Sequence, residues 1–135
     1  MKFMIRFLIE LLMMLNKKKV DNDIYDMSKA FAVRVVNLYK YLVEQRHEYV
    51  MSKQVFRCGT SIGANVHESK NAQSRPDFLS KMNIALKEAD ESDYWLELLH
   101  DTSFIDDKQY ESISQDIHAI IGVLTKIVKT TKNNP

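Results

Sequence analysis

Two Glu-x-x-His pairs are the side chains best placed to do chemistry: Glu44 with His47, and Glu97 with His100. This spacing puts both ligands of a pair on one helix face, as in di-iron bundles, which add a glutamate from each of two further helices. Both pairs fall at the C-terminal ends of predicted helices and lie off the apolar faces. The other helices offer Glu68 and Glu111, and neither is clearly inward. We therefore interpret the pairs as solvated helix ends, where histidine suits the helix dipole, and predict no metal site.

Cys58 is the one candidate for nucleophilic catalysis. No histidine or carboxylate is spaced to activate its thiol, and its place in an apolar helical stripe is typical of a small core residue. The sequence contains no P-loop, no dinucleotide-binding fingerprint and no Ser-His-Asp series. Tyr94 and Trp95 lie in a helical pattern, which favours packing over base stacking. We predict that the protein is not an enzyme and uses no cofactor.

Basic residues offer a different chemistry, contact with phosphate groups. Five of them come from the second predicted helix and the segments that follow: Lys53, Arg57, Lys70, Arg75 and Lys81. They could share one surface that contacts the backbone of RNA or DNA. For Arg57 we favour an ion pair with Glu88 or Glu91, within the bundle or between subunits, because an unpaired buried charge is costly. Lys70, Arg75 and Lys81 are the better phosphate candidates, with solvated surface as the open alternative.

The composition is that of one globular domain. The chain has 135 residues, of which 45% are hydrophobic and 27% charged, an ordinary balance for a soluble protein. Its net charge of +1 predicts no strong nonspecific attraction to nucleic acid or to anionic membranes. A single cysteine excludes an internal disulfide and suits the reducing cytoplasm, where we expect the protein to be located.

Hydrophobic spacing predicts an all-α fold, an antiparallel up-down four-helix bundle over residues 25–132. We expect helices at about 28–46, 50–71, 74–100 and from 106 to a disordered tail at 133–135. Ser28 is the expected N-cap of the first helix, and Ser74 starts the third. The first helix is apolar over more than one face, which indicates a central position or a second chain that covers it. Its additional apolar residues are Ala32, Val33, Val36, Tyr39 and Val43.

Small residues mark the places where helices should approach closely. Gly59 and Gly63 are four residues apart in the second helix, and Ser92 lies in the apolar stripe of the third. A glycine in a helix interior costs about 1 kcal/mol relative to alanine, so two of them suggest a compensating backbone contact. We predict tight helix packing at all three positions.

Residues 1–24 are predicted to be an extension outside the bundle. Its first 15 residues are mostly apolar, but Lys2, Arg6 and Glu10 interrupt them and lysines follow at 17–19. The run is too short to span a membrane and has no signal-peptide cleavage site. We favour an extra helix that packs on the bundle, or a translated leader ahead of a later start at Met14 or Met27. A short amphipathic membrane-surface anchor stays open.

Several segments carry a family resemblance: SKQ at 52–54, RCGTSIGAN at 57–65, DFLSK at 77–81, ALKEA at 85–89 and YWLELL at 94–99. Over about 24–129 the chain resembles the four-helix bundle proteins from intervening sequences of bacterial large-subunit ribosomal RNA genes. The accessory protein of diversity-generating retroelements is a relative of that family. The resemblance implies a ring-like homopentamer. For the retroelement relative it also implies binding to nucleic acid and to a reverse transcriptase, whereas most members have no settled molecular role.

Two functions are consistent with these observations. The first is a non-catalytic, oligomeric adaptor that binds the backbone of RNA or DNA. The second is a protein-interaction or structural assembly module with no nucleic-acid partner, which the near-neutral charge and the broadly apolar first helix favour.

Overall fold

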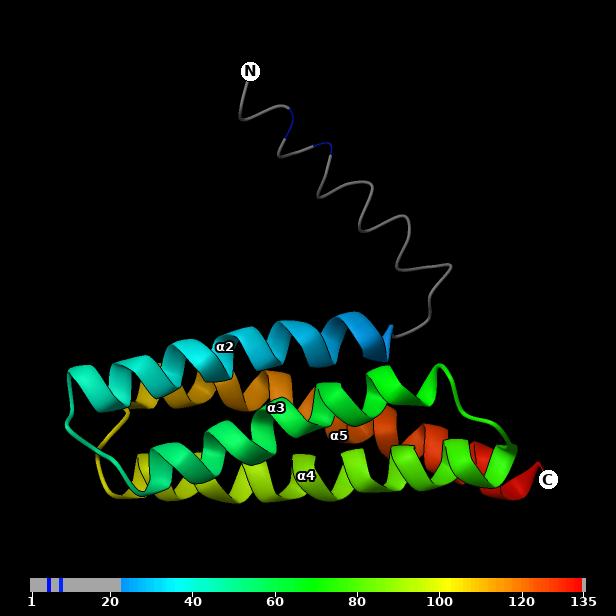
Figure 1. Ribbon diagram of the computed structural model, residues 1–135. Helices are drawn as coiled ribbons and strands as arrows, with labels where there is room; N and C mark the ends of the chain where they lie inside the picture. The colour runs from blue at the N-terminus through cyan, green and yellow to red at the C-terminus, as the bar shows by residue number, and fades with distance from the viewer. Residues whose placement is uncertain (1–4, 6–7, 9–22, 135) are drawn as a thin grey trace.

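A computed structural model describes residues 5, 8 and 23–134 of the chain. Residues 23–134 form four helices: α2 (Ile24–Glu44), α3 (Met51–Ser69), α4 (Arg75–Asp101) and α5 (Asp107–Asn133). The helices run alternately up and down, so that α2 and α4 begin at the end of the bundle where α3 and α5 finish (Figure 1). The predicted all-α four-helix bundle is confirmed. The predictions for residues 1–22 lie outside the described residues, apart from Ile5 and Leu8, which are helical.

The N-cap residue caps α2, α4 and α5 with its own side chain. Asp23 accepts hydrogen bonds from the backbone of Tyr25 and Asp26 at the start of α2. Ser74 accepts from the Asp77 amide at α4, as predicted, and Asp106 forms a reciprocal capping box with Gln109 at α5. Each cap satisfies amide groups that have no partner within the helix.

The predicted start of the first helix was wrong by one turn. Ser28 is not the N-cap but a fully buried residue inside α2, where its hydroxyl donates to the Tyr25 carbonyl oxygen. The helix also ends at Glu44, two residues before the predicted end. At the other end of the chain, α5 continues through Asn133, the first residue of the predicted tail. Hydroxyl groups are tolerated in helix interiors when they bond back to the preceding turn, and this makes the two roles of serine hard to separate in sequence.

Glu48 anchors the start of α3 from the preceding loop. Its carboxylate accepts hydrogen bonds from the amides of Val50, Met51 and Ser52 at 2.7–3.1 Å, and the Ser52 hydroxyl donates to the Glu48 carbonyl oxygen. Burial would by itself raise the pKa of the Glu48 carboxyl, but the three amides outweigh it and lower that pKa. This cap was not predicted from the sequence.

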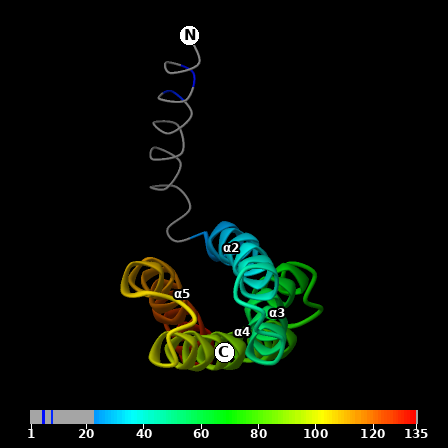
Figure 2. The same cartoon turned by 90° about the vertical axis from the view of Figure 1, so that its left-hand side faces the viewer.

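The core is a continuous cluster of apolar side chains from all four helices. Its largest fully buried members include Phe31, Leu42, Ile62, Leu96 and Leu124. The pairs α2–α3, α3–α4 and α4–α5 pack closely along their length, whereas α2 and α5 pack least. The view along the bundle axis shows α2 and α5 separated on the open side of the bundle (Figure 2).

The close approach of α2 to α3 occurs at the two glycines. A Cβ atom on Gly59 would lie 2.7 Å from Val35 Cγ2, and one on Gly63 would lie 3.3 Å from the Ser28 carbonyl oxygen. Ser92 serves the α3–α4 contact, since its fully buried hydroxyl lies 3.2 Å from Cys58 Sγ. Packing therefore requires a small residue at each of these positions.

Candidate functional site

Arg57 is held by carboxylates of the neighbouring helix. Its guanidinium donates to Glu91 and, at 3.4 Å, to Glu88. Partial desolvation opposes these contacts, but the two carboxylates raise the pKa of Arg57 above its usual value. The structure therefore contains the predicted ion pair, although the Arg57 side chain is 51% exposed rather than buried.

Two more of the five basic candidates have partners. Lys81 Nζ lies 2.9 Å from Glu68 Oε2, and this hydrogen bond raises the lysine pKa. Lys70 Nζ lies 4.4 Å from the centroid of the Tyr25 ring, a cation–π contact. Lys53 and Arg75 are exposed. The five residues do not form one surface, because Lys53 and Arg57 lie in the first half of α3, whereas Lys70, Arg75 and Lys81 lie toward the opposite end of the bundle.

A different charge pattern emerges from the fold, because the helices alternate in direction. Residues 23–33, 61–87 and 121–134 make up one half of the bundle, named here the basic half, and residues 34–60 and 88–120 make up the acidic half. The basic half has eight cations and four carboxylates, and the acidic half has six cations and twelve carboxylates. The eight cations are Lys29, Lys70, Arg75, Lys81, Lys87, Lys126, Lys129 and Lys132. Counting charges along the sequence does not reveal this polarity, since each helix contributes to both halves.

The end of the basic half carries a hollow of about 330 Å³. Arg75, Pro76 and Leu79 of α4 line it together with Thr131 and Lys132 of α5. The start of α4 supplies the positive end of its dipole beside these two cations. Basic side chains of two helices, Arg75 of α4 and Lys132 of α5, therefore share this depression.

The acidic half contains the Glu-x-x-His pairs. His47 lies in the loop after α2 with a φ of 53° and so shares no helix face with Glu44. His100 stacks on the Tyr110 ring at 4.4 Å and its Nε2 lies 2.7 Å from Asp107 Oδ1. The Asp107 hydrogen bond raises the pKa of His100. Within residues 23–134, and at 5 and 8, no three His, Cys, Asp or Glu side chains lie close enough together to hold a metal ion.

Cys58 lies in the core. The residue is fully buried, and desolvation raises its pKa to about 11, although the Ser92 hydroxyl acts in the opposite direction. Since the thiolate is the reactive form, a cysteine in this environment is inert at neutral pH.

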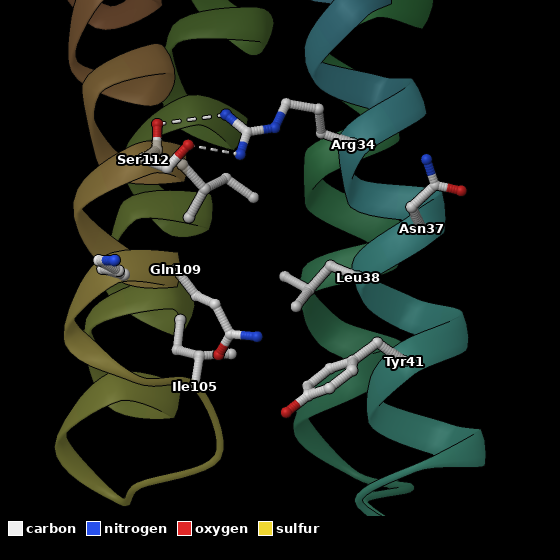
Figure 3. A pocket seen from close by; sticks show the side chains of 9 residues that line it. Arg34, Asn37, Leu38, Tyr41, Ile105, Gln109 and Ser112 are labelled. Atoms are coloured by element: carbon white, nitrogen blue, oxygen red, sulfur yellow. Dashed lines mark hydrogen bonds between the residues drawn. The ribbon is translucent and has the colours of Figure 1, made fainter.

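A groove of about 510 Å³ lies between α2 and α5 in the acidic half (Figure 3). Leu38 and Tyr41 form the α2 wall, and Ile105 and Ile113 form the buried base. Arg34 crosses above the groove to Ser112 and, at 2.5 Å, to Asp116. This groove was not predicted from the sequence. The one feature of the sequence that pointed to the groove is the apolar flank of the first helix at Leu38 and Tyr41. The distance between two helices, however, cannot be predicted from the hydrophobic pattern of either helix.

The outer surface of α2 and α3 carries an apolar strip, defined here by Val33, Val36, Tyr39, Val43 and Phe56. Val33 is 54% and Phe56 is 38% exposed, and the Tyr39 and Phe56 rings lie 5.0 Å apart across the two helices. The broadly apolar face of the first helix is therefore covered only in part by α3. None of the helices described is both long and apolar enough to cross a lipid bilayer.

Comparison with known proteins gives a consistent assignment. No curated protein matches the chain. A crystal structure of a protein of unknown function from the S23 ribosomal protein family of Bacteroides thetaiotaomicron has 57% sequence identity and a TM-score of 0.78, and the match covers 78% of this chain and 98% of that one. The model of the 23S rRNA-intervening sequence protein family matches residues 20–126. The chain therefore belongs to the 23S rRNA-intervening sequence protein family.

Proposed function

We propose that the protein is a non-catalytic adaptor that self-associates and binds the phosphate backbone of RNA through the basic half of its bundle. The observation that carries the proposal is the lengthwise separation of charge, with twice as many cations as carboxylates in the basic half. A polyanion would approach that half and be repelled by the other, although the whole chain is nearly neutral. The family name, which links its members to ribosomal RNA, supports the choice of RNA as the probe.

The hollow at Arg75 and Lys132 is the centre of the proposed contact. Neither side chain forms an ion pair among the described residues. Lys129 precedes Lys132 by three residues on α5, so that a strand of RNA could follow the end of that helix. Self-association would present several copies of this surface and raise the overall affinity.

A binding assay with charge-neutralising variants tests this function. A single-stranded RNA oligonucleotide is titrated at several salt concentrations with the wild type, Arg75→Gln/Lys132→Gln and the matched control Lys53→Gln/Lys108→Gln. Each lost phosphate contact lowers the slope of log K against log salt by about 0.7. We expect the basic-half variant to lose a slope of about 1.4 and the control, with equal charge change in the acidic half, to lose little. Equal losses in both variants, or no binding at low salt, would contradict the proposal.

A second candidate is an assembly module without nucleic acid, and the apolar strip on α2 and α3 favours it. The strip would be covered by another copy of the chain, and the family resemblance suggests a ring-like homopentamer. A reverse transcriptase is a protein partner suggested by the same resemblance. Sedimentation at micromolar concentration should show an oligomer that Val33→Asp dissociates and Tyr94→Asp, a similarly exposed position on α4, does not. A monomeric wild type would refute self-association, and an oligomer that never binds RNA would favour this second candidate.

A further inference from the structure

We infer that the N-terminal segment of the same chain docks in the α2–α5 groove through Ile5 and Leu8. Both residues are helical, and they are 56% and 52% exposed. Their separation of three residues places the two side chains on one face of a helix. They belong to a run in which twelve of the first fifteen residues are apolar, the other three being Lys2, Arg6 and Glu10, so a hydrophobic surface is the expected partner.

The groove has the character that such side chains require. Ile105 and Ile113 at its base are 2% and 5% exposed, while Leu38 and Tyr41 on its wall remain partly exposed. Figure 3 shows Leu38 and Tyr41 projecting from α2 toward Ile105 and Gln109 across an opening between the helices. Elsewhere in the bundle, consecutive helices close over the core. An apolar side chain inserted here would cover the one side on which α2 and α5 leave the core thinly shielded.

The length of the chain allows the docking. Leu38 follows the first residue of α2 by fourteen positions, which is about 21 Å along a helix. Fourteen residues also separate Leu8 from Asp23. They span about 21 Å when helical and about 46 Å when fully extended. Ile5 and Leu8 can therefore reach the groove with the segment running antiparallel to α2.

Charge favours the same orientation. The part of the segment that would reach the groove, residues 1–10, carries Lys2 and Arg6 against Glu10, and the antiparallel course would bring this part to the half of the bundle with twelve carboxylates and six cations. Asp106 and Asp107 lie at the end of the groove toward which Lys2 would point. The attraction is modest at physiological salt, but it favours the antiparallel orientation of the segment along α2.

Thiol reactivity measures whether the groove is covered. Ser112→Cys places a thiol in the groove, and Gln115→Cys places one on the same helix at an exposed position that does not line it. Cys58 contributes only a slow background, since it is buried. The rate of reaction with a water-soluble disulfide is measured for each variant, with and without the pair Ile5→Asp/Leu8→Asp.

We expect the aspartate pair to accelerate the reaction at position 112 by about tenfold or more, because the substituted segment leaves the groove and uncovers the thiol. The reaction rate at position 115 should not change. An unchanged rate at position 112 would refute the docking.

A second measurement shows whether the segment docks on its own chain or on a neighbouring copy. If it docks on its own chain, Ile5→Cys/Ser112→Cys should oxidise to an intramolecular disulfide. Disulfide-linked dimers alone would show docking on a neighbouring copy instead, and binding of the wild type to anionic lipid vesicles through Ile5 and Leu8 would identify a membrane-surface anchor. Either result would overturn the inference.

Discussion

Replacing Gly59 with alanine adds one methyl group at the contact between α2 and α3. In an exposed helix interior this substitution stabilises a protein by about 0.8–1 kcal/mol, because alanine has the higher helix propensity. At Gly59, however, the new Cβ would lie 2.7 and 2.9 Å from the two methyl groups of Val35. Val35 is fully buried and its branched side chain has little rotamer freedom. The overpacking therefore costs about 1–3 kcal/mol and exceeds the gain in propensity.

Gly122 provides the matched control. It lies in the interior of α5, is exposed, and has no atom within 4 Å of the position of an added Cβ. Gly122→Ala should raise the free energy of unfolding by about 0.8 kcal/mol, whereas Gly59→Ala should lower it by about 1 kcal/mol. Helix propensity cancels in the difference between the two variants, which leaves the packing cost at α2.

Denaturant unfolding followed by the helical circular dichroism signal, at one protein concentration, measures both values. Adding Val35→Ala to Gly59→Ala should recover part of the loss, because it removes the two methyl groups that clash. If Gly59→Ala proved as stabilising as Gly122→Ala, the result would contradict a close contact between α2 and α3 at Gly59.

Three further results are expected. Glu48→Gln should destabilise the protein by about 1–3 kcal/mol at neutral pH. Because folding lowers the pKa of Glu48, the stabilisation by its carboxylate is present above pH 4.5 and is lost as the pH falls through the pKa of the folded protein. Unfolding curves of wild type and variant at pH 7 and pH 3 check whether the difference in their free energies of unfolding shrinks. Arg57→Gln should cost less than about 1 kcal/mol, since its ion pairs are half exposed, and the loss should diminish in concentrated salt; a loss that salt does not change would contradict surface pairing. Cys58, with a pKa of about 11, should react with thiol reagents at pH 8 only from the unfolded state, so its rate should rise with denaturant as the unfolded fraction does; a rate that low concentrations of denaturant leave unchanged would show an accessible thiol.

Most of the fold could be predicted from the sequence. The spacing of apolar residues located all four helices, because each helix buries one stripe and the stripe has the period of the helix. Ser74 was identified as a cap, since it precedes a proline and an aspartate at a break in the pattern. Ser28 was misassigned because a buried serine that bonds back to the preceding turn looks like a cap in sequence.

The candidate site was less accessible to prediction. One shared surface was predicted for the basic residues that are near in sequence, but Lys53 and Arg57 lie in the acidic half, whereas Lys70, Arg75 and Lys81 lie in the basic half. Lys70 contacts the Tyr25 ring and Lys81 pairs with Glu68. Such pairings depend on how the helices are rotated against each other. Glu48 escaped notice because glutamate is an uncommon cap and its role depends on the course of the loop.

Lysine footprinting tests most directly whether the basic half holds RNA. The wild-type protein is acetylated with and without a saturating single-stranded RNA oligonucleotide, and the modification of each lysine is measured by mass spectrometry. We expect RNA to protect Lys126, Lys129 and Lys132, and to leave Lys40, Lys53 and Lys108 in the acidic half as reactive as before. Protection of the acidic-half lysines alone, or of none, would contradict the account.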